Sequence, residues 1–438
     1  TSQTTLTANT TIATSGDQQL IAEAKTATAT SRDTMNFVVL PANTVAALPG
    51  GVKDGINYEQ GDTSAILVLY APNKKNILLI GDFNNWAPSA KYQMNITPDL
   101  NRYWIRLTGL VAGKEYAYQY LIDGSLNVAD YNAEKILDPD NDKYISAATY
   151  PGLILYPAGK TPGMVSVLQT KKPAYTWQVA SFKRPDKRNL LIYELLVRDF
   201  VAAQNWQTVK DSIAYLKRLG VNAIEVMPLN EFEGNNSWGY NSIFYFAPDK
   251  AYGTETALKQ FIDECHRQGI AVIMDIALNH SFGQSPMVQM YWDGTKPAIN
   301  SPWFNPVAKH AFNVGYDMNH ESPATQEFVN RVINHWLVNY KIDGFRWDLS
   351  KGFTQTQTCD NNGANCNVGS WNSYDQSRVD IWKKYNGYMQ AAASGSYCIL
   401  EHLGDNPEEK ILADNGMMPW GKMTTAYNQT TMGFTTDS

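Results

Sequence analysis

Apolar and polar positions divide the chain into two regions with different periods. Between residues 56 and 165, short apolar or alternating runs such as AILVLYAP and EYAYQYLID are separated by polar turns such as PNKK and DGS. Short strands with such turns, and no helical period between them, are typical of a β-sandwich. From residue 189 onward, strand-like runs alternate with segments whose apolar residues recur at helical spacing. This second pattern predicts a parallel sheet covered by helices.

The strand-like runs of the second region indicate which parallel fold is formed. They are NLLIYELLV, VNAIEVMPL, IAVIMDIAL, IDGFRWDLS and SYCILEHL. A (β/α)8 barrel of the TIM type is favoured, because charged residues with catalytic chemistry cluster where the strands end. An open doubly wound sheet is the alternative. It would need a glycine-rich phosphate turn after its first strand, and the sequence has none.

We therefore expect four segments along the chain. Residues 1–55 are rich in Thr, Ala and Ser and are expected to form an N-terminal β segment, a partial module, with disorder as the alternative. Residues 56–165 predict an all-β, immunoglobulin-like sandwich, residues 166–188 a linker, and residues 189–438 the (β/α) barrel. Only barrel strands 1–6 can be placed, so the barrel is expected to be incomplete at its C-terminal end.

Composition excludes some partners. The net charge is −6 and the isoelectric point is about 5.6, so no basic surface is available for nucleic acid. No apolar run is long enough to span a membrane. The chain has 12 Trp and 25 Tyr, which fit either large cores or flat platforms for sugar rings. Nothing in the sequence indicates the oligomeric state.

The cysteines indicate a compartment. Cys359 and Cys366 lie in the polar stretch CDNNGANC, and no second pair of ligands accompanies them for zinc. We predict a disulfide that closes this loop, which favours a periplasmic, cell-surface or secreted protein. Cys265 lies in a helical pattern and Cys398 in a strand pattern, so both are expected to be free thiols in the core.

The fourth strand-like run carries two charged residues that point to the same side. Arg346 and Asp348 are two positions apart in GFRWDLSK, so both side chains leave the strand toward the barrel interior, and Trp347 points to the helices. A buried arginine keeps a neighbouring carboxylate ionised, as a nucleophile requires. A purely structural ion pair is the alternative.

A second carboxylate follows the next strand. Glu401 comes directly after the apolar run Tyr397 to Leu400, at the barrel end where active sites lie. Burial there would raise its pKa, as a general acid requires. Asp348 and Glu401 together provide the two carboxyl groups that glycoside hydrolysis needs, one as nucleophile and one as acid and base.

Three short motifs carry a family resemblance. DIALNH (275–280), GFRWDLSK (344–351) and ILEHLGD (399–405) resemble, in order, three of the four short motifs of the α-amylase family. GDFNNW (81–86) is similar to a starch-binding β-sandwich that precedes the barrel in debranching, branching and neopullulanase-type members. Trp86 and Trp104 are candidate glucan platforms there, and core packing is the alternative.

The resemblance implies roles for individual residues. Asp348 is expected to be the nucleophile, Glu401 the general acid and base, and Arg346 the residue that orients the nucleophile. The expected substrate-binding residues are His280, Tyr240, Trp238, Asp275, His402 and Lys351. No cofactor is required, and calcium is the candidate metal, with Asn279 as its ligand. Calcium-dependent members usually follow the lysine with His, whereas Gly352 stands here.

The expected reaction is retaining hydrolysis of α-glucosidic bonds in starch-like α-glucans or maltooligosaccharides. A branching or transglycosylating enzyme is the first alternative, and a non-catalytic glucan-binding protein is the second. The family's fourth motif, a His-Asp pair at the seventh strand, has no counterpart after Glu401. The 438 residues are therefore expected to have little or no activity without that third carboxylate. Preference for α-1,4 or α-1,6 bonds does not follow from these motifs.

Overall fold

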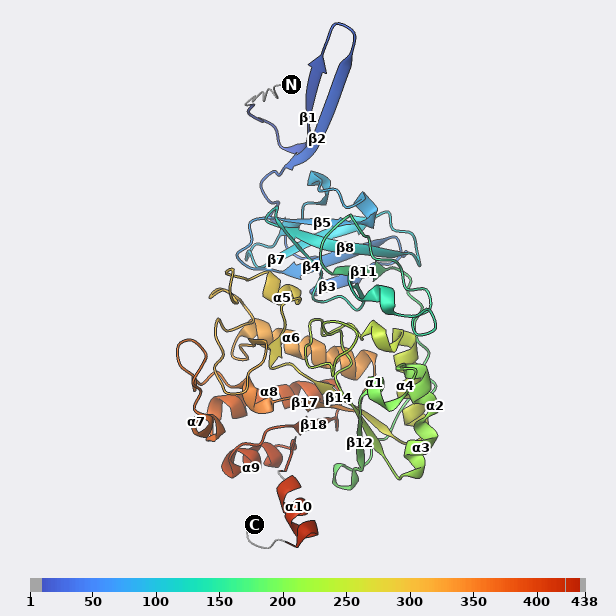
Figure 1. Ribbon diagram of the computed structural model, residues 1–438, viewed down its shortest axis with the longest axis vertical. Coiled ribbons are helices and arrows are strands. Elements are labelled where there is room, and N and C mark those ends of the chain that lie inside the picture. The colour runs from blue at the N-terminus through green and yellow to red at the C-terminus, as the bar shows by residue number, and fades with distance from the viewer. Residues whose placement is uncertain (1–9, 422, 434–438) are drawn as a thin grey trace. The chain divides into compact units, whose positions relative to one another are not determined.

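The computed structural model describes residues 10–421 and 423–433 (Figure 1). The chain forms two compact units. The first consists of Thr1–Asp130 and Pro157–Lys172, and the second of Tyr131–Tyr156 and Pro173–Ser438.

Residues 131–156 lie in the second unit, whereas the sequence pattern assigns them to the sandwich. Buried ion pairs explain the difference. Lys250 Nζ lies 2.5 Å from Glu231 Oε1 and 3.3 Å from Asp142 Oδ1, and all three side chains are buried. Burial alone would lower the pKa of Lys250, but the surrounding carboxylates raise it, so the lysine stays charged. Through these ion pairs Asp142 links residues 131–156 to the loop that follows the strand Ala223–Val226.

The first unit contains two antiparallel sheets. One has the order β3 (Gly55–Tyr58), β4 (Ser64–Tyr70), β7 (Arg102–Thr108) and β6 (Asn95–Ile96). The other contains β11 (Val165–Gln169), β8 (Glu115–Ile122) and β5 (Ile77–Gly81), with β9 (Leu126–Val128) beside β8. A separate antiparallel hairpin, β1 (Gly16–Lys25) and β2 (Thr30–Val39), accounts for part of the expected β segment. Residues 1–9 of that segment lie outside the described residues.

The motif GDFNNW forms a tight turn after β5. A side chain at Gly81 would lie 2.4 Å from the carbonyl oxygen of Ala117, so only glycine fits. Asp82 accepts a hydrogen bond from the indole of Trp86 at 3.0 Å, and the Trp86 side chain is buried. Trp86 is therefore a core residue, and the prediction of a glucan platform at this position is wrong. The indole of Trp104 is half-buried and donates to Ala46 O at 2.9 Å.

A curled parallel sheet forms the centre of the second unit (Figure 1). In the described residues its strand order is β12 (Ile192–Leu195), β13 (Ala223–Val226), β14 (Ala271–Ile276), β17 (Gly344–Trp347), β18 (Tyr397–Leu400) and β19 (Met418–Pro419). Every adjacent pair is parallel, as the sequence pattern predicts. This arrangement supports a barrel of the TIM type.

Helices and short strands connect the parallel strands. The helices are α1 (Val197–Phe200), α2 (Trp206–Asp211), α3 (Ile213–Arg218), α4 (Glu255–Arg267), α5 (Pro286–Gln289), α6 (Pro323–Asn334), α7 (Val368–Asn372), α8 (Gln376–Ala392), α9 (Asn406–Asp414) and α10 (Thr424–Met432). The remaining strands are β10 (Ile136–Leu137), which precedes the parallel strands, and the antiparallel pair β15 (His280–Ser281) and β16 (Tyr316–Asp317). None of the described helices is both long and apolar enough to cross a bilayer.

Side chains alternate between the two faces of the parallel sheet. The inner face carries a buried cluster of Ala223, Ala271, Ile273, Tyr397 and Ile399. Gly344 also lies on the inner face. A Cβ atom at this position would lie 2.2 Å from Tyr397 O, so only glycine allows β17 and β18 to lie this close together. Trp347 points outward and packs edge-on against Trp382 of α8, with ring centroids 5.4 Å apart, as predicted.

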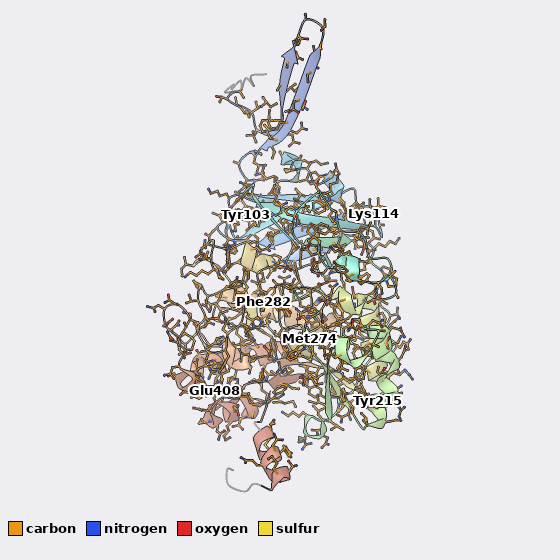
Figure 2. All side chains as sticks on the ribbon, viewed as in Figure 1. Tyr103, Lys114, Tyr215, Met274, Phe282 and Glu408 are labelled. Carbon is orange, nitrogen blue, oxygen red and sulfur yellow. A yellow bond between two sulfur atoms is a disulfide. The ribbon has the colours of Figure 1, made fainter. Side chains whose placement is uncertain are left out.

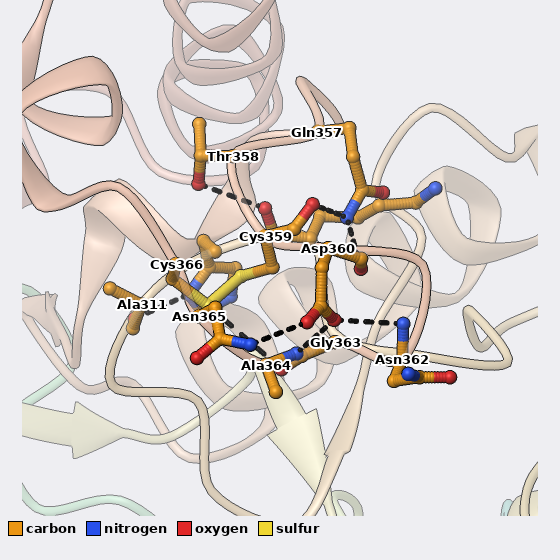
Figure 3. Close-up of a disulfide and its surroundings, with 12 residues drawn as sticks. Ala311, Gln357, Thr358, Cys359, Asp360, Asn362, Gly363, Ala364, Asn365 and Cys366 are labelled. Carbon is orange, nitrogen blue, oxygen red and sulfur yellow. Dashed lines mark hydrogen bonds between the residues drawn. A yellow bond between two sulfur atoms is a disulfide. The ribbon is translucent and has the colours of Figure 1, made fainter.

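The loop after β17 contains the predicted disulfide. Cys359 and Cys366 are bonded (Figure 3), while Cys265 and Cys398 are free and buried, as expected. Inside the loop, Asp360 accepts hydrogen bonds from Asn362 N, Ala364 N and Asn365 Nδ2, all within 2.9 Å. A cross-link and a carboxylate together shape this polar segment.

We predict that Lys250→Met strongly destabilises the second unit. Removing the lysine leaves the carboxylates of Glu231 and Asp142 buried and unpaired, which typically costs about 3–5 kcal/mol. The measurement is denaturant unfolding followed by circular dichroism at pH 7. Lys410→Met is the control, because the Lys410–Asp414 pair on α9 is exposed and should contribute nothing measurable. Equal losses in both variants would contradict the role of the buried pairs.

Candidate active site

Two carboxyl groups leave the same edge of the parallel sheet on adjacent strands. β17 ends at Trp347 and β18 at Leu400, and these two residues are partners in the strand register. Asp348 and Glu401 follow them directly, and Glu401 N donates to Trp347 O at 3.2 Å. The side chains of Asp348 and Glu401 are 18% and 25% exposed. They are therefore held by the strands and remain accessible to a ligand.

One guanidinium connects the carboxyl groups at this edge. Arg346 Nη1 donates to Asp348 Oδ1 at 2.8 Å and to Asp275 Oδ1 at 2.9 Å. Arg346 Nη2 lies 3.1 Å from Glu401 Oε2. The predicted contact between Arg346 and Asp348 is confirmed. Because Asp275 lies on β14, the guanidinium joins side chains from three adjacent strands.

Burial and charge set the protonation of this group. Burial alone would lower the pKa of Arg346, but Asp275, Glu401 and Asp348 raise it, so the cation is permanent. Burial raises the pKa of Glu401, although Arg346 and Leu349 N oppose the shift. The charge of Asp348 and a hydrogen bond with it raise the pKa of Glu401 further. The raised pKa favours the protonated form of Glu401, as a general acid requires.

Backbone and amide donors fix the two carboxyl groups further. Asn279 Nδ2 donates to Asp348 Oδ2 at 3.2 Å and to Asp348 O at 3.0 Å. Leu349 N donates to Glu401 Oε2 at 2.9 Å. Leu349 has φ 41° and ψ 48°, a left-handed conformation that costs a non-glycine residue about 1–3 kcal/mol. This strained residue directs its N–H at the second carboxyl group.

Tyr240 and His280, two residues predicted to bind substrate, are linked to this pair through Asp275 and Asn279. Tyr240 donates its hydroxyl to Asp275 Oδ2 at 2.7 Å, and its backbone oxygen accepts from His280 Nε2 at 2.7 Å. Burial lowers the pKa of His280 to about 4, so the ring is neutral at pH 7. Trp238 is 61% exposed on the loop after β13, which leaves its ring free to stack on a ligand.

His402 and Lys351 do not fit their predicted role in binding substrate. His402 is buried, with Nε2 at 2.7 Å from Glu408 Oε1 of α9 (Glu408 is labelled in Figure 2). Lys351 is also buried, donates to Leu403 O at 2.9 Å, and lies 4.1 Å from the ring centroid of Trp371. Both side chains are used in packing the loops around the site.

Asn279 does not fit the role of a metal ligand. Its amide nitrogen is directed at Asp348, and its oxygen contacts His280 Nδ1. A second oxygen-rich group lies deeper, where carboxylate oxygens of Glu194, Glu225 and Asp275 are within 4.8 Å of one another. Arg346 already supplies positive charge there, since its Nε is 3.9 Å from Glu225 Oε1.

Two residues near Arg346 were missed in the sequence. Glu225 lies on β13, 2% exposed, and its Oε1 has no hydrogen-bond partner. The sequence VNAIEVMPL contained a signal for Glu225. Side chains alternate along this strand, and Glu225 falls on the inward face, as Asp275 does on the adjacent strand. Trp420 follows β19, and its ring centroid lies 4.5 Å from Arg346 Cζ. No local pattern marks that contact.

Residues 179–289 match the alpha amylase catalytic domain. The chain is 26% identical over 278 residues to a malto-oligosyltrehalose trehalohydrolase of Saccharolobus solfataricus, covering 61% of this chain and 43% of that protein. It is 27% identical over 300 residues to a 1,4-alpha-glucan branching enzyme of Cupriavidus pinatubonensis, covering 64% and 37%. It is also 27% identical over 276 residues to chloroplastic isoamylase 1 of Arabidopsis thaliana, covering 54% and 35%.

Solved structures support the same fold. A pullulanase from Bacillus acidopullulyticus superposes with a TM-score of 0.59 at 21% identity, covering 86% of this chain and 46% of that chain. A protein described as a putative alpha amylase from Salmonella typhimurium gives a TM-score of 0.55 at 20% identity, covering 79% and 49%. At these identities the likeness concerns the fold alone.

A parallel sheet with paired carboxyl groups at its C-terminal edge is typical of a β/α-barrel unit. The match over residues 179–289 and the similarity to these relatives support the resemblance to the α-amylase family that the motifs carry. The chain spans less than half the length of the relatives described here.

We predict that Glu225→Gln removes a pH-dependent loss of stability. Burial raises the pKa of Glu225 from 4.5 to about 7, an effect that Arg346 opposes and Glu194 increases. Between these pH values the folded state holds a proton that the unfolded chain has released, so stability falls as pH rises. The Gln variant should be more stable at pH 8 by up to about 3 kcal/mol.

The measurement compares the free energy of unfolding from pH 4.5 to pH 8. Glu321→Gln is the matched control, because Glu321 is exposed and should leave the pH dependence unchanged. A wild-type slope that persists in Glu225→Gln would show that another group carries the buried proton.

Proposed function

We propose that this chain carries the catalytic centre for retaining hydrolysis of α-glucosidic bonds in starch-like α-glucans or maltooligosaccharides. The observation that carries the proposal is the pairing of Asp348 and Glu401 with one guanidinium, that of Arg346. Retaining enzymes hold their two carboxyl groups about 5–5.5 Å apart. We expect that separation here, and it stays a prediction.

The proposed reaction has two steps and passes through a covalent glycosyl-enzyme intermediate. Asp348 attacks the anomeric carbon while Glu401 donates its proton to the leaving glycosidic oxygen. Glu401 then takes a proton from water, which attacks the same carbon and releases Asp348. The raised pKa of Glu401 supports its role as the acid, and Arg346 keeps Asp348 in place for attack. Two displacements at one carbon give net retention.

The substrate class is proposed from the surroundings of the pair and from the relatives. The exposed ring of Trp238 suits stacking on a pyranose, and Tyr240 is oriented by Asp275. The matching proteins include an isoamylase and a 1,4-alpha-glucan branching enzyme. An α-glucan is the substrate that these observations support together.

Transfer to a sugar hydroxyl is the second candidate reaction, favoured by the similarity to a branching enzyme. The same covalent intermediate would serve, with a glucan hydroxyl in place of water. Product analysis with and without added maltooligosaccharide acceptor separates the two. Full retention of glucan binding with no covalent intermediate would instead support the third candidate, a glucan-binding protein.

The proposed location is outside the cytosol, in the periplasm, at the cell surface or in the medium. The bond between Cys359 and Cys366 supports an oxidising compartment. The proposed chemistry uses carboxyl groups and water, and requires no cofactor.

We predict different losses for Asp348→Asn and Glu401→Gln. Asp348→Asn should lose hydrolysis of p-nitrophenyl maltooligosaccharides and of maltosyl fluoride by on the order of 10⁴-fold or more, because the nucleophile is gone. Glu401→Gln should accumulate a covalent adduct from maltosyl fluoride, because fluoride leaves without a proton donor and water lacks its base. Mass spectrometry of peptides should locate the adduct on Asp348.

The assays compare the 438-residue chain with a C-terminally extended chain, because the fourth motif has no counterpart after Glu401. Comparable turnover in both would place the third carboxylate within these residues. An adduct on another residue, or turnover by Asp348→Asn, would contradict the assignment.

We also propose that the β-sandwich of the first unit contributes to glucan binding, as the sequence predicts for residues 56–165. Its two antiparallel sheets and the GDFNNW turn support this reading. Trp86 is buried, so the half-buried Trp104 is the better platform.

We predict that Trp104→Ala weakens retention of the full chain on starch in native affinity gels, measured in an Asp348→Asn background. Aromatic stacking on the sugar is the reason, and the expected loss is about three- to tenfold in affinity. Tyr144→Ala, at an exposed ring of the second unit, is the control. Unchanged retention would reduce the first unit to a structural role.

A further inference from the structure

Trp420 is placed at the active edge of the sheet by the shortest strand. β19 pairs with β18 through Leu400 and Pro419, and Trp420 N donates to Leu400 O at 2.9 Å. Trp420 is thus set beside Glu401, which follows Leu400 on the neighbouring strand. Its side chain is partly buried and packs against the inner cluster that contains Tyr397 and Ile399.

The indole covers a part of Arg346 that no carboxylate uses. A guanidinium donates hydrogen bonds in its plane and presents flat faces above and below that plane. The Nη1 and Nη2 donors of Arg346 are directed at Asp275, Asp348 and Glu401. The ring centroid of Trp420 lies 4.5 Å from Arg346 Cζ, which is cation–π distance.

We propose that Trp420 is a positioning residue of the catalytic pair, holding the guanidinium plane of Arg346 and limiting water around it. The inference rests on the proposed function of Asp348 and Glu401. The angle of that plane decides where Asp348 Oδ1 and Glu401 Oε2 are held, because both are bound to its edge. Removing the ring frees the plane to tilt. It also admits water, which weakens the effects that raise the pKa of Glu401.

A purely structural tryptophan would behave differently. Trp206 is such a residue, since it is fully buried and stacks on Phe261 of α4 in the helical layer. Its replacement by leucine should lower stability and leave the chemistry of the folded fraction unchanged. Trp206→Leu is therefore the matched control for Trp420→Leu.

The first experiment measures kcat, KM and the pH dependence of kcat/KM in whichever chain length turns over. Trp420→Leu should lose roughly 10- to 100-fold in kcat, as is typical for a supporting residue, with KM changed less than about threefold. The alkaline limb of its pH profile should move to lower pH, because Glu401 releases its proton more easily. Trp420→Phe should restore most of the rate, since a flat ring remains.

In the described part of the chain, the titratable groups around Arg346 are Asp275 on β14, Asp348 after β17, Glu401 after β18, Glu225 on β13 and Tyr240 in the loop after β13. Glu225→Gln is therefore included, so that its proton is not mistaken for that of Glu401. An alkaline limb and a kcat that are the same in Trp420→Leu and Trp206→Leu would overturn the proposal.

A second experiment does not require turnover. The protein is labelled with 5-fluorotryptophan, and the resonance missing in Trp420→Phe is assigned to position 420. That resonance should shift with pH as the carboxyl groups around Arg346 titrate, and Asp348→Asn should alter the shift. If the parent protein does not hydrolyse glucan, the proposed function is wrong. The contact between Trp420 and Arg346 can still be tested by this measurement. A resonance insensitive to pH and to Asp348→Asn would overturn the contact itself.

Discussion

The arrangement of side chains on the inner face of the parallel sheet depends on one buried positive charge, the guanidinium of Arg346, which lies among four carboxyl groups. Arg346 could not remain charged in this interior alone, because removing an ion from water costs several kcal/mol. Asp275 and Asp348 bind it directly, and Glu401 and Glu225 lie close by. One cation cannot balance four anions, so protons remain on some of the carboxyl groups. Burial is the main cause that raises the pKa values of Glu225 and Glu401, and the charges of neighbouring carboxylates raise them further.

Local sequence predicts the parts of this arrangement that depend on a single strand. Arg346 and Asp348 share a face, and Trp347 takes the other, because strand geometry alternates. The loop disulfide follows from cysteines that are close in sequence. The order of strands and helices follows from hydrophobic periods in the same way. Each of these features is decided by neighbours along the chain.

Features that depend on distant partners were not predictable. His402 follows the end of a strand, as Glu401 does. Its side chain is nevertheless buried, because it contacts Glu408 of α9. Lys351 is likewise held away from the catalytic pair by its contacts with the Trp371 ring and Leu403 O. Trp420 reaches Arg346 across the intervening strand β18, a contact with no local signal. Strand ends therefore indicate where chemistry can lie, and tertiary contacts decide which side chains take part.

The path of the chain between the two units has a consequence for biosynthesis. Residues 131–156 leave the first unit before its last strand, β11, has been made. Asp142 emerges from the ribosome long before its partner Lys250. During that interval the carboxylate of Asp142 remains in water. The sheets of the first unit are also incomplete until β11 has been synthesised. Neither unit is therefore formed from one uninterrupted piece of nascent chain.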